Sequence, residues 1–280
     1  MVEKNTQSQI IFMLALACEA KPIIDFYGLK KTASSPFAHY QIANEDHNID
    51  LFVSGIGATA MATAIGWAGA HITKAQKAVW LNVGTAGHAT RELGQAVLIN
   101  SCAGDTIART HYPPLVCKWS GATESLISVN TPSNQYPSQA AVDMEAQAFF
   151  NSAQRFASAE LVQSLKVISD NNEHGIEQLN AQKLSDVIYQ NIDGITGYAE
   201  RLLELSRVLP HVDSDLISAP SDLHFTVSQQ HQWQDLRRKA VVMLEKSSID
   251  ISNLASAKSA KQAITILNNV LLSATPRLDD

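Results

Sequence analysis

The chain has 280 residues, of which 45% are hydrophobic and 17% are charged, and its formal net charge at pH 7 is −6. This length leaves room for one large domain, or for a medium domain with an appendage, and for a sizeable buried core. The sequence has no basic block that could follow a phosphate backbone, so a nucleic acid is not expected as a partner.

Short apolar runs alternate with helical stretches rich in small residues from Ile10 to about Arg207. This alternation is typical of an α/β protein in which helices flank a sheet. We expect six strands in one sheet, and three helices that each follow a strand or a turn. The expected strands are 10–17, 49–53, 78–83, 96–99, 126–129 and 161–168, and the expected helices are 58–72, 142–156 and 183–208.

The pattern changes after Leu209 and Pro210, where two further helices are expected at 229–245 and 257–273. Their apolar residues recur at helical spacing, so each helix has one face that must pack on something. We therefore predict two parts, a catalytic domain at 1–208 and a helical C-terminal extension at 209–280, and the pattern leaves the role of the extension open.

The three cysteines, Cys18, Cys102 and Cys117, are an odd number at wide spacings. They form neither a CxxC metal pattern nor a paired disulfide framework, which favours a reducing compartment, the cytoplasm. A competing interpretation is a lipoprotein cleavage site, because the apolar run 10–18 ends in Ala-Leu-Ala-Cys. The run is shorter than the ~20 residues of a membrane span, and the segment before it is not cationic, so a buried first strand is the preferred interpretation. No other segment approaches the length of a membrane span.

Two glycine-containing turns follow predicted strands. Gly55-Ile56-Gly57 opens a small-residue helix, so its backbone, Gly57 included, could approach an anion or a ribose, although a tight strand-to-helix turn explains it equally well. In the second turn Thr85 could hydrogen-bond a water or an anion at the carboxyl edge of the sheet, where α/β proteins place ligands, although a plain glycine turn is the alternative. The nearby His88 is expected to be a solvated loop residue.

Asp143 and Glu145 lie among apolar residues near the start of the expected helix 142–156. They could simply cap the helix, whose dipole favours negative charge at this end. Because residues two apart point to different faces of a helix, we expect one of the two to face inward. An inward carboxylate could accept two hydrogen bonds from a vicinal diol, with Met144 as an apolar wall.

Further polar residues stand at the ends of strands. Asp170 could be a turn former, but in a partly dry pocket its pKa could rise enough for it to donate a proton to a purine nitrogen. Lys166, four residues earlier, could hold an anionic or water nucleophile. Glu19 follows the first strand and is either a surface acid or a general base for an attacking water.

These motifs, in this order, resemble the purine nucleoside phosphorylase and uridine phosphorylase superfamily, and within it the branch of nucleosidases that includes methylthioadenosine/S-adenosylhomocysteine nucleosidases and futalosine hydrolases. The resemblance covers about residues 10–205. It implies a three-layer α/β/α sandwich around a mixed, partly closed sheet, and a homodimer or larger homo-oligomer. The motifs that carry it are Ser54-Gly55-Ile56-Gly57, Asn82-Val83-Gly84-Thr85-Ala86-Gly87, Val142-Asp143-Met144-Glu145-Ala146 and Ile168-Ser169-Asp170.

The resemblance also implies roles for individual residues and a small-molecule nucleoside as substrate, with no cofactor and no metal. The nucleophilic water would be positioned by Glu19, with Gly57, Thr85 and Lys166 completing that site. The family often carries arginine where this chain has Lys166, which leaves the geometry of the nucleophile open. The remaining assignments are Met144 and Glu145 on the ribose hydroxyls, Asp170 as the acid that protonates the base, Ser169 as its support, and Asn130 and Asn171 near the base.

Two alternatives stay open beside a nucleosidase. Phosphorylases of this family bind phosphate through arginines, and the matching loops 17–22 and 84–88 contain none, although Arg91 or Arg109 could reach the site. The second alternative is a nucleoside-binding protein that keeps the fold without turnover. The platform for the base is expected near residues 128–136, a short segment that matches the family poorly and leaves the base and the 5′ substituent open.

Overall fold

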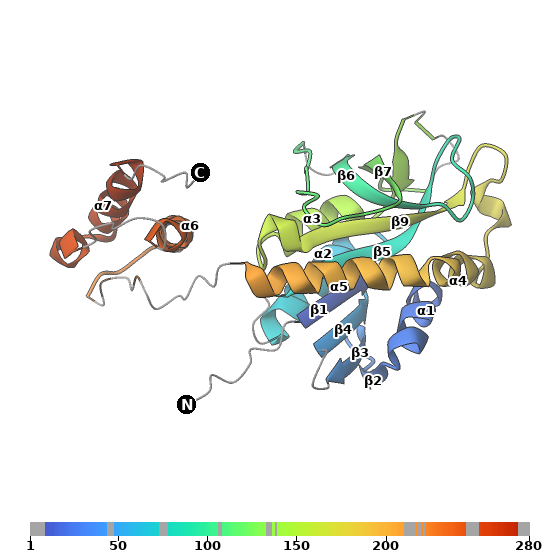
Figure 1. Cartoon of the computed structure of the whole chain (residues 1–280), viewed down its shortest axis with the longest axis horizontal. Helices are drawn as coiled ribbons and strands as arrows, with labels where there is room; N and C mark the ends of the chain where they lie inside the picture. The colour runs from blue at the N-terminus through green and yellow to red at the C-terminus, as the bar shows by residue number, and fades with distance from the viewer. Residues whose placement is uncertain are drawn as a thin grey trace. The chain divides into compact units, whose positions relative to one another are not determined.

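The computed structural model describes residues 9–43, 48–72, 78–105, 108–132, 136–137, 139–209, 217, 220, 222–244 and 252–273. The chain divides into two compact units, Met1–Val208 and Leu209–Asp280 (Figure 1). Each unit has its own apolar cluster and is described by itself.

The first unit is built on a mixed sheet with the order β2-β3-β4-β1-β5-β8-β7-β6-β9. An additional pairing joins β5 to β9, so β5, β8, β7, β6 and β9 form a closed ring at one side of the sheet. The strands are β1 (Gln9–Leu14), β2 (Lys30–Ala33), β3 (Ala38–Ala43), β4 (Asn48–Val53), β5 (Val79–Gly87), β6 (Ala96–Gly104), β7 (Ala122–Ser128), β8 (Ala141–Asp143) and β9 (Val162–Asp170).

Four strands run parallel at the centre of this sheet. The strand β1 pairs in parallel with both β4 and β5, and β5 pairs in parallel with β9. These strands are almost fully buried, as expected for parallel strands that are covered on both faces, although β9 also carries buried polar residues such as Lys166 and Asp170. Their carboxyl ends therefore meet at one edge, where the following loops can place polar side chains.

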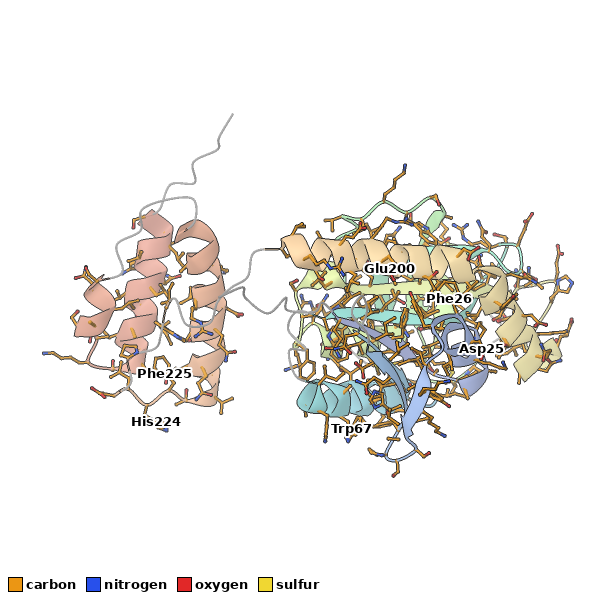
Figure 2. The ribbon with its side chains drawn as sticks, turned by 60° about the horizontal axis from the view of Figure 1, so that its bottom comes forward. Asp25, Phe26, Trp67, Glu200, His224 and Phe225 are labelled. Carbon is orange, nitrogen blue, oxygen red and sulfur yellow. The ribbon has the colours of Figure 1, made fainter. Side chains whose placement is uncertain are left out.

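Helices cover both faces of the sheet. The helix α1 (Ala17–Tyr27) packs against α4 (Ala181–Gln190) and α5 (Ile192–Val208), while α2 (Ala58–His71) packs against α3 (Ala146–Ala153). Figure 2 shows the strands between α5, which carries Glu200, and α2, which carries Trp67. This is the three-layer α/β/α sandwich with a mixed, partly closed sheet that the sequence predicted.

Several element predictions were wrong. Among the described residues the sheet has nine strands in place of six, and the three that were not expected are β2, β3 and β8. The strand β2 is polar and exposed and β8 has only three residues, so neither produces a clear apolar period. Residues 17–27, part of which was assigned to the first strand, form α1. The expected helix 183–208 is interrupted at Asn191, whose side-chain amide donates to the carbonyl oxygens of Gly94 (2.9 Å) and Val187 (2.8 Å).

The second unit contains two helices, α6 (Val227–Leu244) and α7 (Ala260–Ser273), and a short 3₁₀ segment at Ser252–Ser256. A small apolar cluster joins them, and its members are Ile217, Trp233, Ala240, Leu254, Ala263 and Leu267. Among the helices of the described residues, none is long and apolar enough to cross a membrane.

Candidate functional site

Polar side chains gather where the parallel strands end. The residues that follow or end β1, β4, β5 and β9 include Glu19, Gly57, Thr85 and Asp170, respectively. Ligand sites of α/β proteins lie at this edge because loops there diverge and leave space between them. The structure therefore brings together residues that lie far apart in the sequence.

Glu19 is buried in the first turn of α1, with 3% of its surface exposed. Its Oε1 accepts hydrogen bonds from the backbone N–H (2.8 Å) and the hydroxyl (2.7 Å) of Thr85, and its Oε2 accepts one from the N–H of Leu16 (3.1 Å). Burial raises the pKa of Glu19 despite these donors. The interpretation of Glu19 as a surface acid is therefore wrong, and its carboxyl group is held in a fixed orientation, as a general base requires.

Lys166 lies on β9 with 2% of its surface exposed, and its Nζ pairs with Asp143 Oδ2 at 2.8 Å. Burial alone would lower the pKa of Lys166, but the surrounding carboxylates, chiefly that of Asp143, outweigh burial and raise it. Asp143 also accepts hydrogen bonds from the hydroxyl of Ser128 (2.5 Å) and from the N–H of Ala146 (2.9 Å). The lysine is thus a buried cation whose charge is already compensated by the protein.

Glu145 lies at the N-cap of α3, with 7% of its surface exposed. Its Oε1 accepts a hydrogen bond from the N–H of Gly57 at 2.7 Å, and Met144 beside it is half-buried. Burial, with the neighbouring carboxylate of Asp143, raises the pKa of Glu145 to about 7. Gly57 has φ = 98°, a left-handed conformation that favours glycine and aims its N–H at this carboxylate.

The structure corrects the expectation that only one of these two acids faces inward. Asp143 ends the short strand β8 and Glu145 precedes α3, so the two acids do not share a helix as the prediction for 142–156 assumed. Helical spacing therefore does not separate them, and both carboxylates are buried beside Lys166.

Glu19 and Lys166 approach the same point of β5, at Gly84. A Cβ atom at Gly84 would lie 3.4 Å from Glu19 Oε1 and 3.5 Å from Lys166 Nζ. Glu19, Glu145, Thr85, Lys166 and Gly57 therefore form one cluster, connected by the contacts with Thr85 and Gly57 and by the electrostatic influence of Lys166 on both glutamates.

Asp170 ends β9, four residues beyond Lys166, which corresponds to roughly 13 Å along an extended strand. Its Oδ1 accepts a hydrogen bond from Ser169 Oγ, and its Oδ2 accepts one from the hydroxyl of Tyr136, both at 2.5 Å. Asp170 and Ser169 are buried, with 5% and 7% of their surfaces exposed. The structure thus brings Ser169 to Asp170 as expected. A ligand that contacts both Asp170 and the cluster around Lys166 would have to extend over the distance between them.

The two asparagines and His88 are placed differently. Asn171 is buried, and its side chain donates to the carbonyl oxygen of Arg91 and accepts from the N–H groups of Glu173 and His174, so it shapes the loop after β9. Asn130 is exposed. His88 has only 3% of its surface exposed, and the expectation of a solvated loop histidine is wrong, since its Nδ1 accepts hydrogen bonds from the backbone.

The two arginines considered for phosphate binding are engaged or exposed. Arg91 donates to Glu124 at 2.5–2.6 Å and to Gln95 at 3.2 Å. Arg109 is exposed. Within the described part of the chain, no group of three or more His, Cys, Asp or Glu residues is arranged to hold a metal ion, and all three cysteines are free.

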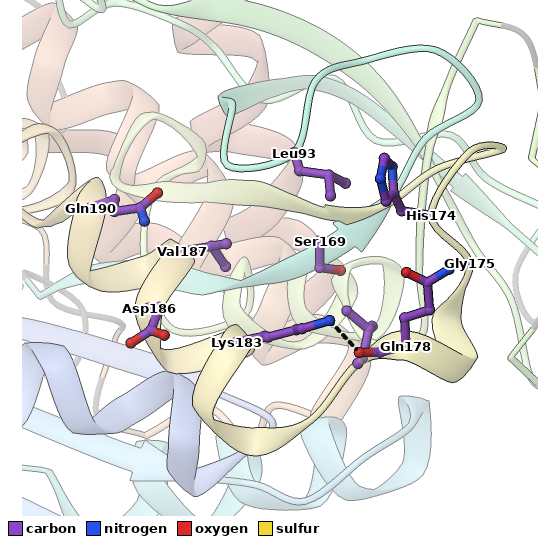
Figure 3. A pocket seen from close by; sticks show the side chains of 10 residues that line it. Leu93, Ser169, His174, Gly175, Gln178, Lys183, Asp186, Val187 and Gln190 are labelled. Atoms are coloured by element: carbon purple, nitrogen blue, oxygen red, sulfur yellow. Dashed lines mark hydrogen bonds between the residues drawn. The ribbon is translucent and has the colours of Figure 1, made fainter.

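A pocket of about 290 Å³ lies between the end of β9, the loop after it and α4 (Figure 3). Ser169 lines this pocket, and its hydroxyl donates a hydrogen bond to Asp170. The residues around Lys166 do not line it, namely Glu19, Glu145, Thr85 and Lys166 itself. Lys183 points across it and donates to the carbonyl oxygen of Gln178 at 2.9 Å. The pocket therefore adjoins the predicted acid but not the cluster around Lys166.

Sequence reasoning missed three contacts of this site. It did not assign Asp143 as the partner of Lys166, Ser128 as a donor to Asp143, or Tyr136 as a donor to Asp170. All three join residues that lie far apart in the sequence. The pairing of β7 with β8, for example, brings Ser128 beside Asp143, and no local pattern encodes that pairing. Tyr136 had one available signal, its place in the segment already expected near the base.

No protein-family model matches the sequence, and no curated protein matches it either. The structure, in contrast, is similar to solved nucleosidases. The nucleosidase MTAN of Chlamydia trachomatis, bound to MTA, superposes with a TM-score of 0.55 at 20% identity over 69% of this chain and 98% of that chain. For 5′-methylthioadenosine nucleosidase of Arabidopsis thaliana the values are 0.53 and 14%, over 73% of this chain and 97% of that chain.

A futalosine hydrolase mutant of Helicobacter pylori is also similar, with a TM-score of 0.51 at 12% identity over 71% of this chain and 100% of that chain. These proteins belong to the nucleoside phosphorylase superfamily. At these identities the likeness establishes the fold, and the first unit therefore has the nucleoside phosphorylase-like fold that the sequence predicted.

Proposed function

We propose that this protein hydrolyses the N-glycosidic bond of a purine nucleoside or of a larger metabolite that carries one. The observation that carries the proposal is the cluster of buried Glu19, Glu145 and Lys166 with the half-buried Thr85, and with Asp170 further along β9. Cleavage of such a bond passes through a cation-like sugar and needs a carboxylate near the ribose and an acid near the leaving base. The similar solved structures include enzymes named as nucleosidases and a futalosine hydrolase, which supports this reaction class.

In the proposed reaction the bond between the anomeric carbon and the base nitrogen breaks, and its electron pair goes to the base. Asp170 gives its proton to the base, at N7 of a purine, while Ser169 holds the other carboxyl oxygen. Glu145 accepts hydrogen bonds from the ribose hydroxyls and stabilises the developing positive charge on the sugar. A water attacks the anomeric carbon and loses a proton to Glu19, so the products are the free base and the free sugar.

The charges of the cluster favour water over phosphate as the nucleophile. The positive charge in this cluster comes from Lys166, whose Nζ already pairs with Asp143 Oδ2 at 2.8 Å. A phosphate anion would enter a region that already holds the acidic groups of Glu19, Asp143 and Glu145, and the described residues of this cluster include no arginine, the side chain that commonly binds phosphate in a bidentate way. A neutral water meets no such repulsion, and the Thr85 hydroxyl and Glu19 can both hydrogen-bond to it.

The proposal is tested by measuring release of free base from adenosine, inosine, methylthioadenosine, S-adenosylhomocysteine and futalosine, with and without phosphate. We expect cleavage without phosphate and a free sugar as product. Formation of ribose 1-phosphate, only when phosphate is present, would replace hydrolysis by phosphorolysis.

Asp170→Asn is the matched variant, because the amide keeps the shape of the carboxyl group but cannot donate a carboxylic proton. We expect base release to fall by at least about a hundredfold, the usual contribution of general acid catalysis, with unchanged circular dichroism. Unchanged turnover would remove the acid role of Asp170. If a nucleoside binds to the wild type but no substrate in the panel is cleaved, the chain is a binding protein.

A further inference from the structure

The hydroxyl of Tyr136 donates a hydrogen bond to Asp170 Oδ2 at 2.5 Å. The other oxygen, Oδ1, is bonded at the same distance by Ser169, the residue that precedes Asp170 on β9. Both carboxyl oxygens of the proposed acid are therefore engaged. Ser169 belongs to a buried strand, whereas Tyr136 is a half-buried residue between β7 and β8.

A base that takes a proton from Asp170 must bring its nitrogen within hydrogen-bond distance of one of these oxygens. Oδ1 faces the hydroxyl of Ser169, which is itself buried. Of the two donors, Ser169 is part of a buried strand and Tyr136 is not, so Oδ2 is the oxygen that a ligand can reach by displacing its donor. The base and the phenol compete for one carboxyl oxygen.

The ring of Tyr136 is seated against the end of β5, where Gly87 is paired with Asp170. A Cβ atom at Gly87 would lie 2.3 Å from Tyr136 Cε1 and 2.6 Å from Asp170 Oδ2, closer than atoms approach in proteins. The absence of a side chain at Gly87 thus creates the space in which the ring and the carboxyl group meet. The same space lies at the carboxyl edge of the sheet, where the proposed substrate binds.

We propose that Tyr136 is a specificity-determining residue for the leaving base, bonding the oxygen of Asp170 that the base must reach and yielding it only to a base that can itself hydrogen-bond to the protonated carboxyl group. This inference rests on the proposed function, because it takes Asp170 as the acid. A purine meets the condition through N7, which accepts a hydrogen bond from the protonated carboxyl group of Asp170 and then its proton. A ring without an acceptor at that position leaves the phenol in place.

The first experiment observes Tyr136 in the wild-type protein by NMR, with ¹³C at Cζ of the six tyrosines. The resonance missing from the spectrum of Tyr136→Phe identifies Tyr136. We expect titration with adenine to shift this resonance and to leave that of Tyr189, which is exposed on α4, unchanged. Binding of adenine without a shift of the Tyr136 resonance overturns the inference.

The second experiment measures the Kd of adenine by calorimetry for wild type, Tyr136→Phe and the control Tyr189→Phe. Phenylalanine keeps the ring but removes the competing hydroxyl, so we expect adenine to bind about five- to tenfold more tightly, which is the usual contribution of one hydrogen bond. The control is expected to bind as the wild type does. Equal or weaker binding by Tyr136→Phe overturns the proposal.

The outcomes separate this inference from the proposed function. If adenine binds and displaces Tyr136 but no nucleoside is cleaved, the proposed function fails and the competition at Asp170 stands. If adenine binds to neither wild type nor Tyr136→Phe, the inference fails, whatever the cleavage assay shows. Should Tyr136→Phe not fold, the shift measured in the wild type decides, with the Tyr136 resonance identified from a second substitution at that position.

Discussion

Replacing Glu145 by glutamine should make the folded protein more stable at alkaline pH. The carboxyl group of Glu145 is buried, and its pKa is raised from 4.5 to about 7 by burial and by the neighbouring Asp143. Between these two values the folded chain holds a proton that the unfolded chain has released, so the stability of the wild type falls as the pH rises through this window. Above pH 7 the folded protein carries a buried charge that it disfavours.

The size of the effect follows from the two pKa values. A rise from 4.5 to about 7, at about 1.4 kcal/mol per pKa unit, corresponds to about 3 kcal/mol at pH 8. At pH 5 the same relation leaves under about 1 kcal/mol. Glutamine removes the charge and retains an oxygen that can accept the hydrogen bond from Gly57, so Glu145→Gln should gain between about 1 and 3 kcal/mol at pH 8 and much less at pH 5.

Urea unfolding at pH 5 and pH 8, followed by tryptophan fluorescence, measures this difference. Trp80 reports on the first unit, because its side chain is fully buried next to Phe156. The exposed Glu92 provides a matched control, and Glu92→Gln should change the free energy of unfolding by less than about 0.5 kcal/mol at either pH. If Glu145→Gln were no more stable than the wild type at pH 8, the reasoning from buried charge would be refuted.

Three further predictions concern other residues of the same unit. Lys166→Met should lower the free energy of unfolding by about 3 to 5 kcal/mol in urea at pH 8, because it leaves the carboxylate of Asp143 buried without its cation. A loss below about 1 kcal/mol would show that the pair contributes little. Thr85→Val keeps the backbone donor to Glu19 but removes the hydroxyl donor, so kcat for base release should fall about tenfold with unchanged KM. A rise in KM alone would instead assign Thr85 to substrate binding. A chain ending at Val208 should stay soluble and show the circular dichroism of an α/β protein, since the first unit has its own core, and an insoluble product would show that the unit depends on residues 209–280.

The positions of the candidate site residues in the fold could be predicted from the sequence better than the contacts among them. Glu19, Thr85 and Asp170 each follow or end an apolar strand, and the rule that carboxyl ends of parallel strands meet is enough to expect them at one edge. This rule needs only the order of apolar runs and turns, which are strong local signals. The fold class could be predicted for the same reason.

The contacts within the site depend on strand pairing, which a local pattern does not contain. The segment around Asp143 and Glu145 illustrates this limit, since it was expected to be helical because the apolar residues that follow have helical spacing. In the structure β8 takes three residues from that segment and pairs with β7, which places Ser128 against Asp143. A three-residue strand is too short to produce a period, so its existence follows only from its neighbours.

The buried charges argue that this cluster exists for chemistry. Replacing a buried ion pair by apolar residues of similar size is often neutral or stabilising, so stability alone gives little reason to keep Lys166 and Asp143 inside the protein. Glu19 and Glu145 add two buried carboxyl groups whose pKa values are raised, which identifies them as groups held in an unfavourable environment. Groups of this kind concentrate at functional sites, where the environment that disfavours a charge also brings its pKa close to the working pH. If Glu145→Gln proves more stable but loses base release, the two effects together will assign that instability to function.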